Sequence, residues 1–164
     1  MSYGEPAPVV RLFVSYAHND SFWMQSLLPL LRFDGVQVKP WTDKDIRTGV
    51  RWDEEIKREL NEMHVFIPLV SVHFAVSKYI NEVECEIARK RLENREIEVV
   101  PIYVAFPGED ELEWLMRLQR VPPGDKSWAE TYREFKEHDL ALAPIRDGIK
   151  KVVERARRRV CGGV

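Results

Sequence analysis

One glutamate of this sequence stands where a helical pattern calls for an apolar residue. Residues 79–94 predict an amphipathic helix, and its apolar stripe consists of Ile80, Val83, Ile87 and Ala88. Glu84 falls inside that stripe, whereas the other charged residues of the segment fall on the remaining faces. Burial of a carboxylate costs several kcal/mol unless the group is paired, protonated or functional. Glu84 is therefore either a catalytic carboxylate or the partner of a basic side chain such as Arg11 or Arg91.

Polar and aromatic residues also follow the segments that predict strands. These segments are residues 9–15, 36–41, 65–71 and 99–104, which are short, apolar and rich in β-branched side chains. In a parallel sheet the carboxyl ends of the strands meet at one edge, where ligands bind. The residues expected at that edge are Ser15, Tyr16, Trp41, Asp43, Ser71 and residues 104–106.

Helical patterns alternate with these strands. Helices are predicted from residue 21 up to Gly35 and over residues 52–63, 79–94, 111–118 and 143–159. Pro29 predicts a kink or a split in the first helix, whereas Pro68 and Pro101 are unfavourable inside the third and fourth strands. Strand–helix alternation with apolar strands favours right-handed βαβ units. We therefore expect an α/β fold: a flavodoxin-like three-layer sandwich whose central parallel sheet of about five strands has helices on both faces.

The composition is that of one folded domain, and it lacks the overall positive charge that attracts nucleic acid. The 164 residues are 45% hydrophobic, and 25 basic against 27 acidic side chains give a net charge of −2. We expect one domain over residues 9–159 and flexible ends at residues 1–8 and 160–164. No apolar run approaches the roughly 20 residues of a membrane helix, and no signal-peptide pattern is present. The expected location is the cytoplasm, with neither nucleic acid nor membrane as a partner.

Several common kinds of site are disfavoured by spacing. The glycines form neither a G-x-G-x-x-G pattern nor a P-loop, and no G-x-S-x-G motif occurs. The histidines form no H-x-x-x-H pair, and Cys85 and Cys161 have no neighbouring ligands, so we expect no metal site and no disulfide framework. A phosphate-accepting receiver needs an aspartate at the end of the third strand, where this chain has Ser71.

Five motifs in order resemble the TIR (Toll/interleukin-1 receptor) domain in its bacterial form. They are residues 12–16 (LFVSY) with Asp20, residues 41–49 (WTDKDIRTG), residues 52–56 (WDEEI), residues 70–79 (VSVHFAVSKY) and residues 100–102 (VPI). The second of these resembles the BB loop of the family. The resemblance covers roughly residues 9–158, which is nearly the whole chain.

The resemblance implies an enzymatic activity, because many TIR domains hydrolyse NAD+ at its nicotinamide–ribose bond with a glutamate on the helix after the third strand. Glu84 matches that glutamate. Ordinary glycosidases need a second carboxylic acid to protonate the leaving group, whereas the nicotinamide of NAD+ is cationic and leaves as a neutral molecule. One carboxylate therefore suffices to hold the ribose and to stabilise an oxocarbenium-like charge. NAD+ would be the substrate, and no cofactor is expected.

The resemblance also implies a set of substrate-binding residues. They are Ser15, Tyr16, Trp41, Asp43, Ser77 and Tyr79. Each has a second interpretation: Ser15 and Tyr16 could cap the next helix, and Ser77 could be an N-cap. Trp41 stacks on a substrate ring or fills the core, and Asp43 shapes the loop after the second strand.

One position departs from the pattern of the NAD-cleaving relatives. Some of them carry a basic residue directly after the serine–tyrosine pair, where this chain has Ala17. We therefore expect phosphate binding from Lys44 or Arg47.

Two functions follow from these observations. The first is an NAD+ nucleosidase that releases nicotinamide and either ADP-ribose or a cyclic isomer, in bacterial antiphage defence or signalling. The alternative is a non-catalytic scaffold that assembles with other TIR domains. The expected partners are NAD+, a second copy bound through the BB loop (Trp41 to Trp52), and a separate sensor or effector protein.

Overall fold

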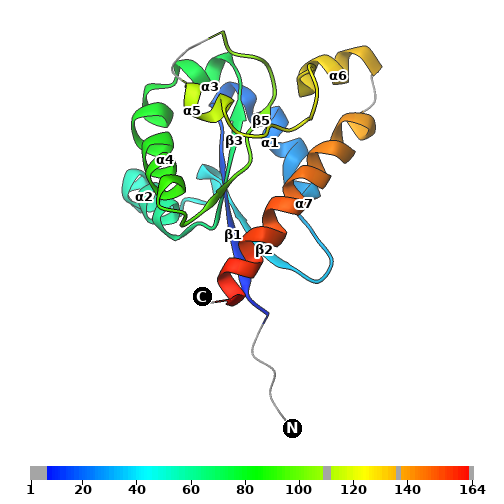
Figure 1. Cartoon of the computed structure of the whole chain (residues 1–164). Helices are drawn as coiled ribbons and strands as arrows, with labels where there is room; N and C mark the ends of the chain where they lie inside the picture. The colour runs from blue at the N-terminus through cyan, green and yellow to red at the C-terminus, as the bar shows by residue number, and fades with distance from the viewer. Residues whose placement is uncertain (1–6, 109–111, 136–137, 163–164) are drawn as a thin grey trace.

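A parallel sheet of five strands lies at the centre of the computed structural model, which describes residues 7–108, 112–135 and 138–162 (Figure 1). The strands are β1 (Val9–Ser15), β2 (Gln37–Trp41), β3 (Val65–Val70), β4 (Glu98–Val99) and β5 (Ile102–Tyr103). Their order is β2-β1-β3-β4, and β5 also pairs with β3. Every strand pairing is parallel, which confirms the predicted α/β class.

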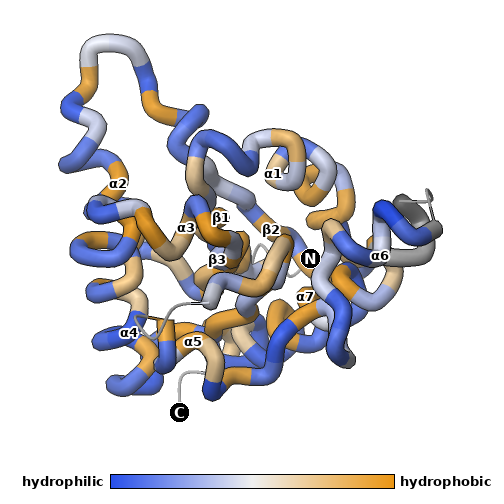
Figure 2. Tube along the Cα trace, turned by 90° about the horizontal axis from the view of Figure 1, so that it is seen from above, coloured by the Kyte–Doolittle hydropathy of each residue, from blue (hydrophilic) through white to orange (hydrophobic). Residues whose placement is uncertain are grey.

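Helices cover both faces of this sheet, as Figures 1 and 2 show from two directions. The helices are α1 (Ser21–Leu27), α2 (Trp52–Glu62), α3 (Val72–Val76), α4 (Cys85–Glu93), α5 (Glu113–Met116), α6 (Trp128–Phe135) and α7 (His138–Gly162). Helices α1 and α7 share one hydrophobic core with the sheet, and α2 and α4 share the other. The three layers are therefore those of the predicted flavodoxin-like sandwich.

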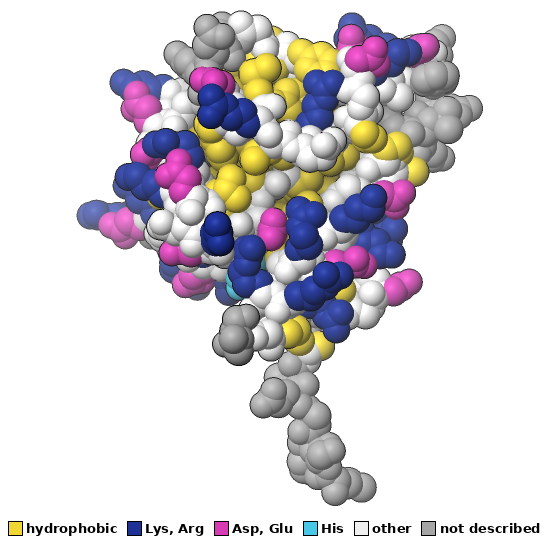
Figure 3. Space-filling model, viewed as in Figure 1, with side chains coloured by type: hydrophobic (Ala, Val, Ile, Leu, Met, Phe, Trp, Pro, Cys, Tyr) yellow, Lys and Arg dark blue, Asp and Glu magenta, His cyan; other side chains and the backbone are white. Residues whose placement is uncertain are grey.

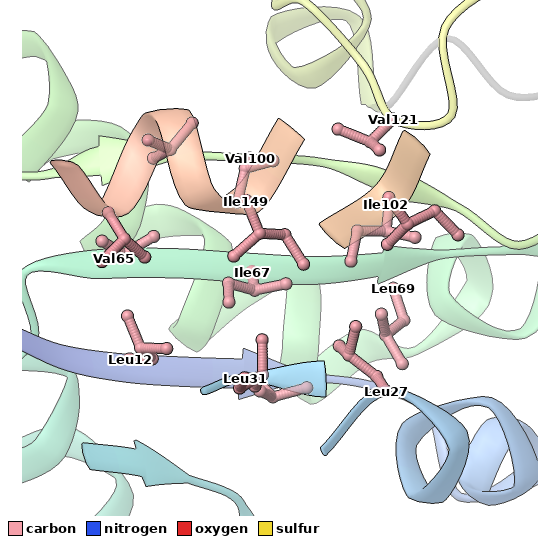
Figure 4. Packing of buried hydrophobic residues seen from close by; sticks show 14 of the residues in the cluster. Leu12, Leu27, Leu31, Val65, Ile67, Leu69, Val100, Ile102, Val121 and Ile149 are labelled. Atoms are coloured by element: carbon pink, nitrogen blue, oxygen red, sulfur yellow. The ribbon is translucent and has the colours of Figure 1, made fainter. Parts of the chain in front are cut away.

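The two cores take alternate residues of the strands. Leu12 and Val14 of β1 point toward α1 and α7, whereas Phe13 points toward α2. Figure 4 shows the first core, with Ile67 of β3 between β1 and Ile149 of α7. All six residues of β3 are buried because β3 has strands on both sides and helices on both faces.

The prolines disturb the strands less than their number suggests. Pro68 lies opposite Ser15, the last residue of β1, so its missing N–H group falls where the β1–β3 ladder ends. Pro101 divides the predicted fourth strand into β4 and β5. Helix α1 ends at Leu27, and the chain continues as the 3₁₀ turn Leu28–Leu30, which contains Pro29, so the helix splits there. The predicted extension of this helix to Gly35 is wrong.

Other helical segments also differ from the prediction. Helix α3 and helix α6 were not predicted, and the predicted helix over residues 79–94 begins with a π-helical turn, Ile80–Glu84. Helix α7 begins at His138, before the predicted residue 143, and it runs to Gly162, past the predicted domain boundary at residue 159. Of the ends predicted to be flexible, residues 1–6 and 163–164 lie outside the described residues. None of the described helices combines the length and apolar character of a membrane span.

Candidate active site

A cavity of about 620 Å³ opens at the carboxyl end of β1. Its walls come from the end of β1, the loop after β2, the start of α2, the end of α3 and the π-helical turn. The lining residues include Tyr16, Asp43, Trp52, Ser77, Tyr79 and Glu84. Its position is the edge of the sheet where ligands were expected, and its volume falls in the range of small-molecule sites.

Glu84 lines this cavity and is only 7% exposed. The Ser15 hydroxyl donates a hydrogen bond to Glu84 Oε2 at 2.6 Å. Burial raises the pKa of Glu84 from 4.5 to about 7; the bond from Ser15 opposes this rise, and the charge of Asp43 adds to it. The carboxyl group can therefore change its charge near neutral pH.

The alternative in which a basic residue neutralises Glu84 is wrong. The Arg11 guanidinium pairs with Glu59 at 3.1 Å, and Arg91 pairs with Glu96 at 3.0 Å. Arg91 also donates to the Leu60 carbonyl oxygen, at 2.7 Å. In the described part of the chain, no lysine or arginine forms an ion pair with Glu84. Its pKa is governed by burial instead.

The π-helical turn gives Glu84 its direction. The backbone N–H of Cys85 donates to the carbonyl oxygen of Ile80, five residues earlier, in place of the usual four. In a regular α-helix, residues five apart point about 140° away from each other. The wider π turn reduces that angle, so that Tyr79 and Glu84 both line the cavity. The prediction of a continuous α-helix over this segment is therefore wrong at its first turn.

Asn81 anchors this turn to the end of α3. Its side-chain amide donates to the carbonyl oxygens of Phe74, Ala75 and Ser77 at 3.1, 3.0 and 2.8 Å. The Ser77 hydroxyl accepts a long bond of 3.5 Å from the backbone N–H of Ile80, so Ser77 acts as a cap and also lines the cavity. These bonds fix the chain on both sides of Tyr79.

Tyr16 and Asp43 form a second polar pair in the cavity wall. The Tyr16 hydroxyl donates to Asp43 Oδ1 at 2.5 Å. Burial, then this hydrogen bond, raises the pKa of Tyr16, which keeps the phenol neutral. Asp43 also lies 3.9 Å from Nε2 of His18. Asp43 is held by the 3₁₀ turn Asp43–Asp45, which Thr42 caps, so it lines the cavity and shapes the loop.

Trp41 is a core residue and not part of the cavity wall. Its side chain is 6% exposed and stacks on Phe13, with the ring centroids 4.9 Å apart. Of the two interpretations from the sequence, the core one describes its position. Trp52, which was not among the predicted site residues, lines the cavity instead. It is 55% exposed, and its ring packs against Tyr79 with centroids 4.9 Å apart.

A pattern in the sequence could have found Trp52. It is the first residue of α2 and lies four residues before Ile56 on the apolar face, but it is not part of the hydrophobic core that contains Ile56. When the apolar stripe of a helix extends beyond the hydrophobic core, an aromatic residue at that end of the stripe is available to contact a ligand.

The other candidates lie away from this cavity. Ser71 donates to Asp20 Oδ2 at 2.5 Å, and both side chains are buried. Lys44 and Arg47, the expected phosphate ligands, are exposed and do not line it. A second cavity of about 640 Å³ lies between α4, the segment after α5 and α7, where Figure 3 shows an apolar hollow bordered by lysines and arginines. None of the predicted site residues lines it.

Two other kinds of chemistry find no support around Glu84. Burial raises the pKa of the neighbouring Cys85 thiol, so it is not a thiolate nucleophile. No group of three or more histidine, cysteine, aspartate and glutamate side chains suited to a metal ion occurs within the described ranges.

The comparison with protein families matches residues 12–138 to the TIR domain. Since this match spans well over half of the 164 residues, the chain belongs to the TIR domain family, as its motifs suggested. A comparison with curated proteins gives no significant match. The family includes members that cleave NAD+ and members that act as scaffolds, and TIR domains generally self-associate.

Proposed function

We propose that this TIR domain is an NAD+ nucleosidase in which Glu84 is the catalytic carboxylate. It would cleave the nicotinamide–ribosyl bond and release nicotinamide with ADP-ribose or a cyclic isomer. The observation that carries the proposal is a buried carboxylate, that of Glu84, which is 7% exposed, has no basic partner in the described chain and lines a ligand-sized cavity. A buried unpaired carboxylate destabilises a fold and is retained where it serves chemistry.

The arrangement suits a reaction whose leaving group needs no proton. The ring nitrogen of NAD+ carries a positive charge and becomes neutral when the bond to the ribose breaks, while positive charge develops on the sugar. A carboxylate in a poorly solvated site stabilises that charge more strongly than one in water. Ser15 engages Oε2 of Glu84, and we assign the other carboxylate oxygen to the ribose hydroxyls.

The remaining wall residues have supporting roles in this proposal. Tyr16 and Asp43 would position the ribose. Trp52 and Tyr79 would contact the nicotinamide ring, in place of the predicted contact from Trp41. Ser77 would contact the substrate or act only through its cap of the π-helical turn. Phosphate contacts from Lys44 or Arg47 would have to form outside the cavity, where both side chains lie exposed.

Self-association belongs to the same proposal. Residues 41–52 connect β2 with α2, and most of their side chains after Thr42 are partly or fully exposed. A second copy bound through this segment would lie beside the cavity, because Asp43, Ile46 and Trp52 line it. The scaffold alternative uses the same surface and needs no inward carboxylate. A bacterial defence role with a separate sensor or effector protein is compatible with either function.

The test is nicotinamide release from NAD+ by concentrated purified protein with a crowding agent, followed by chromatography that separates linear from cyclic products. The key variant is Glu84→Gln. The matched control is Glu82→Gln, which changes an exposed glutamate two residues before Glu84 in the same π-helical turn. We expect release by the wild type and the control but not by Glu84→Gln. Release by all three proteins rejects Glu84, and release by none favours the scaffold.

A further inference from the structure

The side chains around Glu84 select for positive charge on a ligand. We propose that the cavity takes N-ribosyl pyridinium cations as its substrate class and that it recognises the cationic ring and the ribose without reading the phosphates. This inference rests on the proposed function, because it concerns the same site. Its consequence is that nicotinamide riboside, which has no phosphate, is a substrate.

The first support is the charge of the cavity wall. Asp43 and Glu84 both line it, and each is close enough to the other for the Asp43 charge to raise the pKa of Glu84. The wall residues include no lysine or arginine among those that the structure describes, and the two histidines there are His18 and His73. The exposed His18 imidazole lies 3.9 Å from Asp43. A cation entering the cavity therefore meets two carboxyl groups.

The second support is an aromatic corner beside Glu84. Trp52 and Tyr79 pack with ring centroids 4.9 Å apart at an interplanar angle of 57°, so their faces form a corner and not a stack. Both rings line the cavity. Aromatic faces attract cations, and a contact of a cation with a tryptophan face strengthens binding by roughly tenfold when it is partly desolvated. A flat cationic ring fits this corner better than a sugar or a phosphate does.

The third support is that the same wall, over the residues that the structure describes, has carboxyl groups and no lysine or arginine with which to bind a phosphate. A phosphate on the ribose 5′ oxygen would stay within a few bonds of the sugar that Glu84 holds, near two carboxylates. Lys44, Arg47 and Arg51 of the loop after β2, and Lys78 beside Tyr79, are all exposed and are not part of the cavity wall. In NAD+ the pyrophosphate continues to the adenosine and can leave the cavity, whereas the dianionic phosphate of nicotinamide mononucleotide ends beside it.

The reaction needs no co-reactant other than water. The C1′–N bond of nicotinamide riboside breaks and its electron pair stays on the ring nitrogen, which gives neutral nicotinamide. The oxygen of one water molecule forms the new bond to C1′, and one proton of that water is released. The products are nicotinamide, ribose and a proton, so atoms and charge balance.

The kinetic test compares kcat/KM for nicotinamide riboside, nicotinamide mononucleotide and NAD+ with the full chain. We expect nicotinamide riboside to be cleaved within about tenfold of NAD+ and faster than the mononucleotide. If NAD+ is cleaved but kcat/KM for nicotinamide riboside is more than a hundredfold lower, the proposed substrate class is wrong. The proposed function remains intact in that case.

A binding test examines the preference for cations independently of the proposed NAD+ cleavage, and it can be used when turnover is low. Calorimetry with 1-methylnicotinamide, a cation that cannot be cleaved, is compared with neutral nicotinamide. We expect the cation to bind at least tenfold more tightly, the preference to persist in Trp52→Phe, and most of it to be lost in Trp52→Ala. Equal binding of the two probes, or an unchanged preference in Trp52→Ala, overturns the inference whether or not NAD+ is cleaved.

Discussion

Replacing Glu84 by glutamine is expected to make the protein more stable at pH 8 while it removes the activity. Glutamine keeps the size of the side chain and a carbonyl oxygen that can accept the hydrogen bond of Ser15. What it removes is the negative charge that a side chain with 7% exposure must carry at high pH. Stability and activity then change in opposite directions, which a merely structural glutamate in an ion pair would not produce.

The size of the gain follows from the two pKa values. The pKa of Glu84 rises from 4.5 in the unfolded chain to about 7 in the fold, and each pH unit of that difference is worth about 1.4 kcal/mol. The folded state therefore holds its proton more tightly, and stability falls as pH rises from about 4.5 to about 7. Above pH 7 the full penalty is present, roughly 3 kcal/mol as an order of magnitude, and it vanishes below pH 4.5.

The assay is thermal unfolding of wild type, Glu84→Gln and the control Glu82→Gln between pH 5 and pH 8. Glutamine adds its own cost for the side-chain NH₂ group, but that cost is the same at every pH, so the change of the difference with pH is diagnostic. For a chain of this length, 3 kcal/mol corresponds to about 6–12 °C in Tm. A difference between Glu84→Gln and wild type that is constant from pH 5 to pH 8 would refute the reasoning.

Three further predictions concern catalysis and the surroundings of the site. Nicotinamide release should rise with pH through about 7, the pKa of Glu84, and should fall tenfold per pH unit below it; a profile flat from pH 5 to pH 8 would contradict the active carboxylate form. Asn81→Leu removes three hydrogen bonds, so it should lower the free energy of unfolding by about 1–3 kcal/mol in denaturant titrations and reduce release, whereas the exposed Asn61→Ala should change neither. Gly148→Ala places a methyl group 2.7 Å from a Val121 methyl and should cost about 1–3 kcal/mol in the same titrations; an unchanged midpoint would show that α7 can shift.

The sheet and the position of Glu84 were predictable from the sequence because both depend on local pattern. Buried parallel strands need continuous apolar runs, and residues 65–70 form one. Glu84 stood out because an amphipathic helix has a period that a charge can break. Both patterns correspond to buried positions in the structure: the residues of β3 are buried, and so is Glu84 in the cavity wall.

The parts that failed depend on contacts between distant segments. The π-helical turn has the same apolar spacing as an α-helix, and its one extra residue per turn is set by the bonds of Asn81 to the end of α3. Trp41 and Trp52 flank the same loop. Only the structure shows that Trp41 stacks on Phe13 in the core. Helix α6 carried an unused local signal, a capping box between Ser127 and Glu130.

The central claim, that Glu84 is the carboxylate that cleaves NAD+, is tested most directly by proton NMR of paired reactions at pH 8. Wild type and Glu84→Gln are incubated with NAD+ at equal concentration, and free nicotinamide is followed in each. The structure predicts that nicotinamide accumulates with the wild type and not with Glu84→Gln, although the variant is at least as stable. Accumulation at the same rate in both reactions would contradict the claim.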